Sequence, residues 1–438
     1  MSGADPCLSV FLGEQQIASL QLSADQLLWH YAASWQQQGF ALSPHLPLQG
    51  EIPPLNVQRF LRNLLPEGPG LEELLASFRL ARHNTFALVQ AIGQETAGAL
   101  TLLPAGQSPT DTTQFRPLSE PELAERLASR QQLGLTVWDG KPRLSVAGVQ
   151  DKLNLLLDPE RGMGFGEGRL CSTHILKFER PELPHLVLNE YVSMQLARAC
   201  ELTVAQVERR VIGGHPALLV SRFDRKAELP TQVRRRHLID GCQVLNLPPE
   251  YKYERNFLYG HKAGSSRDVA HIRDGANLPA LFAFAAACRN PAQTRKAMLE
   301  WVLFNLLIGN ADAHGKNLSF FVGKQGIELA PWYDLVNIAL YPDYEQDLAM
   351  ALGDEFNAAA IHAYQLADFA DSCQLPRSLI SRQLTILAQR LQRELADLPA
   401  RYATTPDEQA YLQRYQQWIE ARCHHLLGEV DGIKEMVL

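Results

Sequence analysis

The apolar run at residues 293–309, QTRKAMLEWVLFNLLIG, restricts the fold more than any other segment. It is apolar on nearly all sides, so it predicts a helix buried at the centre of a domain. Gly309 stands where a helix C-cap is expected. The segment GNADAHGKN at 309–317 then places an aspartate, a histidine, a lysine and two asparagines at the end of this helix. A metal site, a catalytic loop and a solvated turn would each explain these polar residues.

Length and composition favour a globular protein of two or three domains, because 438 residues are enough to bury sizeable cores. Hydrophobic residues make up 46% of the chain and charged residues 20%, which is ordinary for a soluble protein. The net charge of −7 gives no general attraction to nucleic acid or to an anionic membrane. The densest basic run, VRRRH at 233–237, is short, and we interpret it as a solvated loop.

The seven cysteines are spread from Cys7 to Cys423 and include no C-x-x-C pair. This spacing argues against a zinc ribbon or a disulfide framework and favours a reducing compartment. The N-terminus has no basic region followed by an apolar one, and no apolar run is long enough to span a bilayer. We therefore expect a cytoplasmic protein with no membrane partner.

The first part of the chain, residues 1–110, predicts a small α+β module. Apolar and polar residues alternate at 8–22, LSVFLGEQQIASLQL, which predicts a β-hairpin, and 86–104 predicts a second one. Between them, 57–81 has helical spacing that a Pro-Gly-rich turn interrupts. Residues 104–122 are rich in Pro, Ser and Thr and form the best linker candidate.

The remainder predicts an α/β domain at 111–245 and an all-helical domain at 246–438. Four segments read as strands: PRLSVAG at 142–148, KLNLLLD at 152–158, THILKFE at 173–179 and ALLVSRFD at 217–224. One helix, NEYVSMQLARACE, lies between the last two, and helical patterns dominate after residue 246. The expected fold class is therefore α+β.

The polar cluster after the buried helix has the spacing of a phosphoryl-transfer site. Asn317 follows Asp312 by five residues, and Asp334 follows a hairpin-like stretch at 318–332. This is the order of the catalytic loop and the metal-binding aspartate in protein kinases. There the first Asp accepts the substrate's hydroxyl proton, while the Asn and the second Asp supply the oxygen ligands that Mg²⁺ prefers. Lys316 can offset charge on the transferred phosphoryl group.

Two further residues fit a nucleotide site. Lys177 stands in a strand-like, otherwise apolar segment, where an unpaired lysine is costly. Glu190, thirteen residues later, opens a helix and can form the lysine–glutamate ion pair of kinases. Each residue alone is better explained as a snorkelling lysine or a first-turn glutamate. Their order together with the Asp/Asn/Asp pattern favours the kinase interpretation.

The assignments of His314 and of two glycine-bearing segments stay open on spacing alone. His314 can join the nucleotide or metal site, although a loop histidine bonded to nearby backbone is the favoured alternative. The segment GMGFGEG at 162–168 is not a G-x-x-x-x-G-K-[ST] loop, and we interpret it as a hairpin tip. The segment SVAGVQDK at 145–152 offers backbone amides and Lys152 that can cover a triphosphate.

Taken in order, these segments resemble the HipA family of serine/threonine kinase toxins. The resemblance rests on SVAGVQDK, THILKFE, NEYVSMQLA, LLVSRFDR, LIGNADAHGKN and LAPWYDLVN, and FLRNLLPEG and DLAMALGDE also fit. It covers nearly the full length, and DAHGKN is also similar to the D-R-H-x-x-N loop of phosphoinositide kinases. The resemblance implies an atypical protein-kinase-like fold, with an N-terminal α/β part that includes a small β-containing subdomain, an all-α C-terminal lobe, and ATP between them.

The resemblance also implies roles for individual residues. It makes Asp312 the base, Asn317 and Asp334 the magnesium ligands, and Lys177 the partner of the α- and β-phosphates. Ser145 matches the serine that these kinases autophosphorylate. The phosphate-covering loop would comprise Ser145, Val146, Ala147, Gly148, Val149, Gln150, Asp151 and Lys152. The adenine hinge would lie at Ile239 and Gly241, although family members carry an acidic residue where Ile239 stands.

The partners follow from the resemblance only. It implies a HipB-like helix-turn-helix antitoxin that binds the kinase and operator DNA, so that the toxin meets DNA indirectly. The implied substrate is an aminoacyl-tRNA synthetase, typically the glutamyl enzyme, whose phosphorylation stalls translation and gives drug-tolerant dormancy. Two alternatives stand beside this: a catalytically silent co-repressor, and a metal-dependent hydrolase that uses Asp312, His314 and Asp334.

Overall fold

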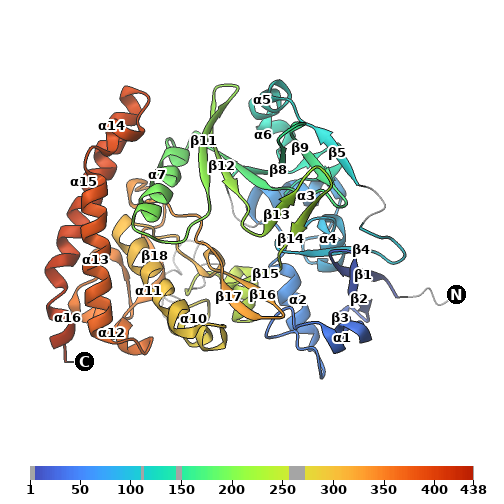
Figure 1. Ribbon diagram of the computed structural model, residues 1–438, viewed down its shortest axis with the longest axis horizontal. Helices are drawn as coiled ribbons and strands as arrows, with labels where there is room; N and C mark the ends of the chain where they lie inside the picture. Colours follow the sequence, from blue (N-terminus) through green and yellow to red (C-terminus); the bar gives the residue numbers. More distant parts are fainter. Residues whose placement is uncertain (1–4, 110–112, 145–149, 256–271, 438) are drawn as a thin grey trace. The chain divides into compact units, whose positions relative to one another are not determined.

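The computed structural model in Figure 1 describes residues 5–109, 113–144, 150–255 and 272–437. The chain divides into two compact units, which are described separately. Unit 1 comprises residues 1–180, 206–249 and 320–327, and unit 2 comprises residues 181–205, 250–319 and 328–438. Helices and strands occur together, so the expected α+β class is confirmed. The three predicted domain ranges stay a prediction.

Unit 1 begins with a four-stranded antiparallel sheet in the order β3-β2-β1-β4. Its strands are β1 (Cys7–Leu12), β2 (Gln15–Ser23), β3 (Gln26–Tyr31) and β4 (Leu100–Pro104). The first predicted hairpin is confirmed as β1 and β2. The interrupted helical segment predicted at 57–81 is confirmed as two helices, α2 (Pro54–Arg62) and α3 (Gly68–Phe78). A short helix, α1 (Ala33–Gln38), follows β3.

The second predicted hairpin is wrong in its first half. Residues Thr85–Ile92 form the helix α4, and only β4 is a strand. The side chain of Asn84 accepts the N–H of Ala87 at 3.0 Å and caps the helix. The run FALVQAI is apolar enough to be buried with either period, so its periodicity could not distinguish the two states.

A six-stranded sheet follows in the order β11-β12-β10-β8-β9-β5. Its strands are β5 (Gln114–Pro117), β8 (Lys152–Asp158), β9 (Gly162–Glu167), β10 (His174–Phe178), β11 (Val207–Ile212) and β12 (His215–Ser221). Three of the four strand-like segments are confirmed as β8, β10 and β12. The fourth, at 142–148, falls mostly on residues outside the described ranges.

The segment GMGFGEG is part of this sheet and is not a hairpin tip. It forms β9, which pairs with both β8 and β5. A Cβ at Gly164 would lie 2.4 Å from the carbonyl of Arg116 and 2.6 Å from the ring of Phe115, so glycine permits β5 to approach closely. The prediction that residues 104–122 form a linker is therefore partly wrong. This stretch contains β5 and the start of α5 (Glu120–Ala128).

The run VRRRH is not a solvated loop. It extends from β14 (Gln232–Arg235) to His237, which is buried, and Arg235 donates to the carbonyls of Gly98 and Leu100 at 3.2 and 2.7 Å. Arg235 belongs to a cluster of charged groups inside unit 1 with Glu95, Arg222, Asp224 and Arg225. Burial acts against the charged form of Glu95, but Arg222 and Arg225 outweigh it and lower the pKa of that carboxyl.

The remaining elements of unit 1 are short. They are α6 (Arg130–Leu133), β6 (Val137–Trp138), β7 (Lys141–Pro142), β13 (Arg225–Glu228), β15 (Leu238–Asp240), α8 (Gly241–Val244), β16 (Ser319–Gly323) and β17 (Gly326–Leu329). β16 and β17 form the hairpin predicted after the polar cluster, and their sheet has the order β15-β16-β17. The residues that join β17 to Asp334 belong to unit 2.

Unit 2 is mainly helical. Its helices are α7 (Leu186–Ala199), α10 (Leu278–Phe284), α11 (Pro291–Ile308), α12 (Ala363–Ser372), α13 (Arg377–Leu395), α14 (Leu398–Tyr402), α15 (Pro406–Glu429) and α16 (Gly432–Glu435). The apolar run is confirmed as α11, which packs against α13 and α15 (Figure 1). This part of the chain is not entirely helical, because β18 (Asp347–Leu352) and β19 (Glu355–Asn357) also lie in it.

The seven cysteines are all free thiols, and only Cys7 is not fully buried. Within the described ranges, no helix has the length and apolar character needed to cross a bilayer.

Candidate active site

The loop with the predicted catalytic residues begins at Gly309, the C-cap of α11. Gly309 has a φ of 74°, in the left-handed region, and its N–H donates to the carbonyl of Asn305. Its own carbonyl accepts the N–H groups of Ile338 and Ala339 at 3.0 and 3.2 Å. A Cβ here would lie 2.4 Å from the ring of Trp418 on α15. The helix therefore ends at a position that suits glycine alone, and the same residue fixes the chain beyond Asp334.

Asn317 and Asp334, the two predicted magnesium ligands, lie together. Nδ2 of Asn317 donates to Oδ2 of Asp334 at 3.4 Å. Nδ2 of Asn310 donates to the backbone carbonyl of Asp334 at 3.3 Å and to Oδ1 of Asn305 at 2.7 Å. Asp334 has a φ of 54°, which residues other than glycine rarely adopt. Such local strain is often found at functional sites, where the surrounding structure has to maintain it.

Asp312, the predicted base, is exposed, and its carboxylate is held in place by a tyrosine. The hydroxyl of Tyr253 donates to Oδ1 of Asp312 at 2.6 Å, and the backbone N–H of Asp312 donates to Oδ1 of Asn310 at 3.2 Å. The ring of Tyr253 also packs edge-on against His314, with ring centroids 5.2 Å apart. The sequence interpretation missed Tyr253, because the segment YKYERN at 251–256 matches no motif.

His314 and Lys316 are buried, so the loop is not the solvated turn that was one of the alternatives. The N–H of His314 donates to Oδ1 of Asn317 at 3.1 Å. The carbonyl of Lys316 accepts the hydroxyl of Tyr333 at 2.6 Å, and that hydroxyl lies 2.8 Å from Oγ of Ser319. The hydrogen bonds within the loop therefore fix its backbone, and the loop does not depend on solvent for its shape.

Helix α7 also fixes the chain that follows Asp334. Asn189 is completely buried; its Nδ2 donates to the carbonyl of Asn337 at 2.9 Å, and its Oδ1 accepts the N–H of Asn337 at 2.7 Å. The neighbouring Glu190 is also buried, with 2% of its surface exposed, and is the fifth residue of a helix that begins at Leu186. Glu190 therefore does not open the helix, and it is not an exposed first-turn glutamate. The role of Asn189 was not predicted.

In unit 1, two buried lysines stand side by side in the six-stranded sheet. Lys177 on β10 pairs directly with Lys152 on β8, and both are about 93% buried, with exposures of 7% and 6%. Directly paired residues on neighbouring strands lie on the same face, with Cβ atoms about 5 Å apart. Two buried positive charges in such a place are compatible with a site for an anion such as a nucleotide phosphate. Lys177 belongs to unit 1 and Glu190 to unit 2, and the ion pair between them stays a prediction.

The C-terminal end of the predicted phosphate-covering loop is attached to β10. Nε2 of Gln150 donates to the carbonyl of Phe178 at 3.3 Å. The guanidinium of Arg180 donates to the carboxylate of Asp151 at 2.7 Å and forms an ion pair with it. The other predicted members of this loop, Ser145, Val146, Ala147, Gly148 and Val149, lie outside the described residues. Only the C-terminal end of this predicted loop therefore lies within the described residues.

The predicted hinge residues lie where β15 meets α8. Ile239 is completely buried, and Gly241 is the first residue of α8. The carboxylate of Asp240 caps this helix by accepting the N–H of Gln243 at 2.8 Å. The carbonyl of Gly241 accepts the N–H of Leu245 at 3.0 Å, so a nucleotide contact would use other backbone groups here.

Unit 1 also contains a cavity of about 400 Å³ that the sequence did not predict. Its wall includes Glu73, Arg130, Asp151, Lys152 and Arg180. The carboxylate of Glu73 accepts the three consecutive N–H groups of residues 135–137 at 2.8–3.0 Å. The guanidinium groups of Arg130 and Arg180 face Asp151 at 3.6 and 2.7 Å. Several charges of the wall are therefore engaged within the protein.

Comparison with known proteins gives a consistent result. The family model described as HipA N-terminal domain matches residues 8–103, and the HipA-like C-terminal domain model matches residues 144–395. The chain is 45% identical over 434 residues, 98% of each protein, to the serine/threonine-protein kinase toxin HipA of Shewanella oneidensis. It is also similar to the HipA chain in a solved complex of HipA, HipB and operator DNA from that organism, with a TM-score of 0.89 and 44% identity. That similarity covers 98% of this chain and all of the other.

Proposed function

The chain belongs to the HipA family, and from this premise we propose that it is the kinase toxin of a toxin–antitoxin pair. It is a serine/threonine protein kinase. In the proposed reaction it uses ATP and Mg²⁺, transfers the γ-phosphoryl group to a protein hydroxyl, and modifies its own Ser145. The single observation that carries the proposal is the contact between Asn317 and Asp334, because Asn317 stands on the loop after α11 that also carries the exposed Asp312.

The residues at this loop suit a magnesium-bound triphosphate. Asp334 supplies carboxylate oxygens and Asn317 an amide oxygen, and these hard ligands are the kind that Mg²⁺ takes in nucleotide sites. When bound, the metal neutralises charge on the phosphate oxygens. The contact of Asn317 with Asp334 keeps both side chains close enough to share one ion. The hydrogen bond from Asn310 to the backbone carbonyl of Asp334 helps to maintain the strained conformation of Asp334 in that position.

The base in the proposed mechanism is Asp312. Its exposed carboxylate accepts the proton of the attacking serine or threonine hydroxyl, and the hydroxyl of Tyr253 fixes its orientation. Lys316 is buried in the same loop and supplies positive charge near the transferred group. Lys177, together with the adjacent Lys152, binds the α- and β-phosphates.

The first experiment measures transfer of labelled phosphate from ATP in the presence of Mg²⁺. The parent protein should label itself at Ser145, and Asp312→Asn should lower the rate by roughly a thousandfold, because general-base catalysis accounts for about 10²–10⁴ of such rates. Ser145→Ala should abolish self-labelling and retain transfer to an external protein. Equal labelling of Asp312→Asn and the parent would remove Asp312 from the mechanism.

The same assay separates the two alternatives. A metal-dependent hydrolase would release phosphate from ATP without labelling any protein, and a silent co-repressor would do neither. The presence of Lys177 beside Lys152 favours a nucleotide site, which the silent co-repressor does not need, and the label on protein then separates the kinase from the hydrolase.

The proposed partners are a HipB-like antitoxin and, through it, operator DNA, because the similar HipA chain was solved in such a complex. The proposed substrate is an aminoacyl-tRNA synthetase such as the glutamyl enzyme, and the proposed location is the cytoplasm. Phosphoproteomics after brief induction, with Asp312→Asn as the control, tests the substrate. A profile without a synthetase peptide would contradict translation arrest by this route and leave the kinase activity standing.

A further inference from the structure

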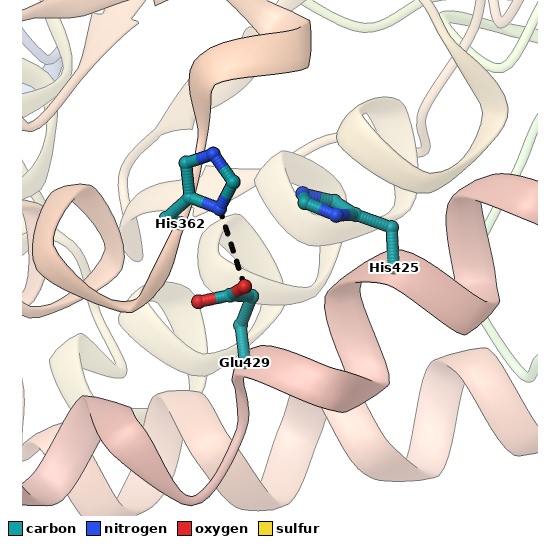
Figure 2. A group of neighbouring side chains, drawn as sticks. All are labelled: His362, His425 and Glu429. Carbon is teal, nitrogen blue, oxygen red and sulfur yellow. Dashed lines mark hydrogen bonds and ion pairs between the residues drawn. The ribbon is translucent and has the colours of Figure 1, made fainter.

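Two histidines and a glutamate converge in unit 2, in a part of the chain that the kinase mechanism does not use. His425 and Glu429 stand four residues apart on α15 and so lie on the same face of that helix. His362 is the residue immediately before α12. Figure 2 shows the three side chains facing one another, two from α15 and one from the segment that leads into α12. Their candidate ligand atoms all lie within 4.8 Å of one another.

The spacing of these atoms is close to that of a metal site. In a tetrahedral zinc site, bond lengths of about 2.0–2.1 Å place neighbouring ligand atoms roughly 3.3 Å apart. Nδ1 of His362 already lies 3.2 Å from Oε1 of Glu429, so one edge of the coordination polyhedron is formed. The rings of His362 and His425 have centroids 5.0 Å apart at an angle of 76°. Since no two of the three ligand atoms lie more than 4.8 Å apart, side-chain movement alone has to close the remaining spacing.

The groups around the cluster already orient two of the three ligands. Nε2 of His425 lies 3.0 Å from the carbonyl of Ile361 and therefore donates to it, which leaves the lone pair of that ring on Nδ1. Oε2 of Glu429 accepts the N–H of Ala363 at 2.9 Å, so Oε1 is the oxygen turned toward His362. A backbone carbonyl behind a histidine ligand and a hydrogen bond behind a carboxylate ligand are the usual supports of a metal site.

The segment before α12 is also fixed to α15 independently of the cluster. The guanidinium of Arg422 donates to the carbonyl of Ala358 at 2.6 Å, one turn of α15 before His425. Ile361 is completely buried. The backbone on both sides of the cluster is therefore held in place, and metal binding would order only side chains. The charge of Arg422 disfavours a cation nearby, so we expect moderate affinity.

We propose that His362, His425 and Glu429 form a Zn²⁺ site that ties the start of α12 to the end of α15. Two imidazole nitrogens and one carboxylate oxygen suit zinc and similar transition metals, whereas Mg²⁺ prefers oxygen ligands alone. The side chain of His362 is 53% exposed, so water can take the fourth position. The site is separate from the nucleotide chemistry and does not depend on the proposed kinase function.

The test uses the full-length protein after treatment with EDTA and dialysis. Titration with ZnCl₂, followed by calorimetry and native mass spectrometry, should show one more zinc ion bound by the parent than by His425→Gln. Glutamine keeps a donor for the Ile361 carbonyl but offers no imidazole nitrogen. His424→Ala is the matched control, because His424 is exposed and is the next residue on the same helix. It should bind zinc as the parent does.

Thermal unfolding gives a second measurement. Zinc should raise the melting temperature of the parent and of His424→Ala by a few degrees and leave that of His425→Gln unchanged. Asp334→Asn is the control for zinc bound at the candidate active site, because it removes a carboxylate there. It should keep the full rise in melting temperature. Equal zinc binding by the parent and His425→Gln would overturn the proposal, and so would loss of the zinc in Asp334→Asn.

Discussion

At the scale of single residues, Tyr253 is a site residue that only the structure revealed. It donates to the carboxylate of Asp312 and packs against His314, and the carbonyl of the preceding residue, Lys252, accepts the N–H of Gly315 at 2.9 Å. Nothing in the segment 251–256 indicates this role, because the contact joins residues 59 positions apart. The placement of Asp312 and Asn317 on one loop was predictable from their five-residue spacing, while their roles stay a prediction.

Replacement of Tyr253 by phenylalanine tests this contact. Tyr253→Phe removes the hydroxyl that holds the Asp312 carboxylate, and a hydrogen bond to a charged group contributes about 1.5–3 kcal/mol. We expect kcat for phosphoryl transfer to fall by about tenfold or more, and the melting temperature to fall by only a few degrees at most, because the contact is exposed. Tyr251→Phe, two residues earlier, is the matched control and should keep the parent's rate. A Tyr253→Phe enzyme as fast as the parent would show that the contact does not orient the base.

At the scale of elements, the junction of α11 with the loop depends on a single glycine. α11 is buried on nearly all sides, so its end has to turn sharply within the packed interior. Gly309 makes that turn with a positive φ and lies against Trp418. The sequence indicated the cap by the position of the glycine, but it did not indicate that α15 covers it.

Substitution of this glycine should therefore be costly. Gly309→Ala combines left-handed backbone strain with a Cβ 2.4 Å from the Trp418 ring, and we expect a loss in the free energy of unfolding on the order of 3 kcal/mol. Kinase activity should fall with it. Gly428→Ala on α15 is the control: open space surrounds its position, and the free energy of unfolding should rise by about 0.5 kcal/mol. Urea unfolding of both variants measures the difference. A Gly309→Ala variant as stable as the parent would show that a Cβ can be accommodated beside Trp418.

A second element, α7, positions the strained Asp334 through Asn189. Asn189→Ala leaves the N–H and the carbonyl of Asn337 without their side-chain partner inside the protein, and each unsatisfied buried group costs about 1–3 kcal/mol. We expect both a lower melting temperature and a higher KM for magnesium. Ser193→Ala, one turn further along the same buried helix, should lower stability without changing the magnesium dependence. If the two variants respond alike to magnesium, Asn189 has only a structural role.

At the scale of the whole molecule, burial of ionisable groups in unit 1 gives stability a definite pH dependence. His237 is buried, and Nε2 donates to the carbonyl of Leu42 at 2.9 Å. Burial lowers the pKa of His237 to about 4, from an ordinary value near 6.5. The histidine is therefore neutral in the folded protein at a pH where it is already protonated in the unfolded chain.

The sign of the effect follows from this difference. Between pH 6.5 and 4 the unfolded chain binds a proton that the folded protein does not, so stability falls as the pH falls, by about 3 kcal/mol in total. His237→Gln should be less stable at pH 7 but should lose less stability across this range, as measured by urea unfolding at several pH values. His424→Ala should keep the parent's slope. The lowered pKa values of Glu95 and Asp224 act at lower pH, where these carboxylates become protonated.

The sequence by itself determined the elements with strong local patterns. The hairpin of β1 and β2, the buried α11 with its glycine cap, and the strands with Lys152 and Lys177 each follow from periodicity and composition over a few residues. The loop spacing of Asp312 and Asn317 is of the same kind, because both residues stand on one turn of chain. Resemblance to a known family then connected these segments in the right order.

Tertiary structure decided what depends on residues distant in sequence. Residues 85–92 are helical because a cap and the surrounding core select one of two apolar periods. The glycines at 162–168 form a strand because β5 packs close against them, and Arg235 is ordered by carbonyls more than 130 residues away. The cluster of His362, His425 and Glu429 likewise exists only where α12 begins against α15. Such contacts leave no local pattern, since burial and packing depend on which segments meet in space.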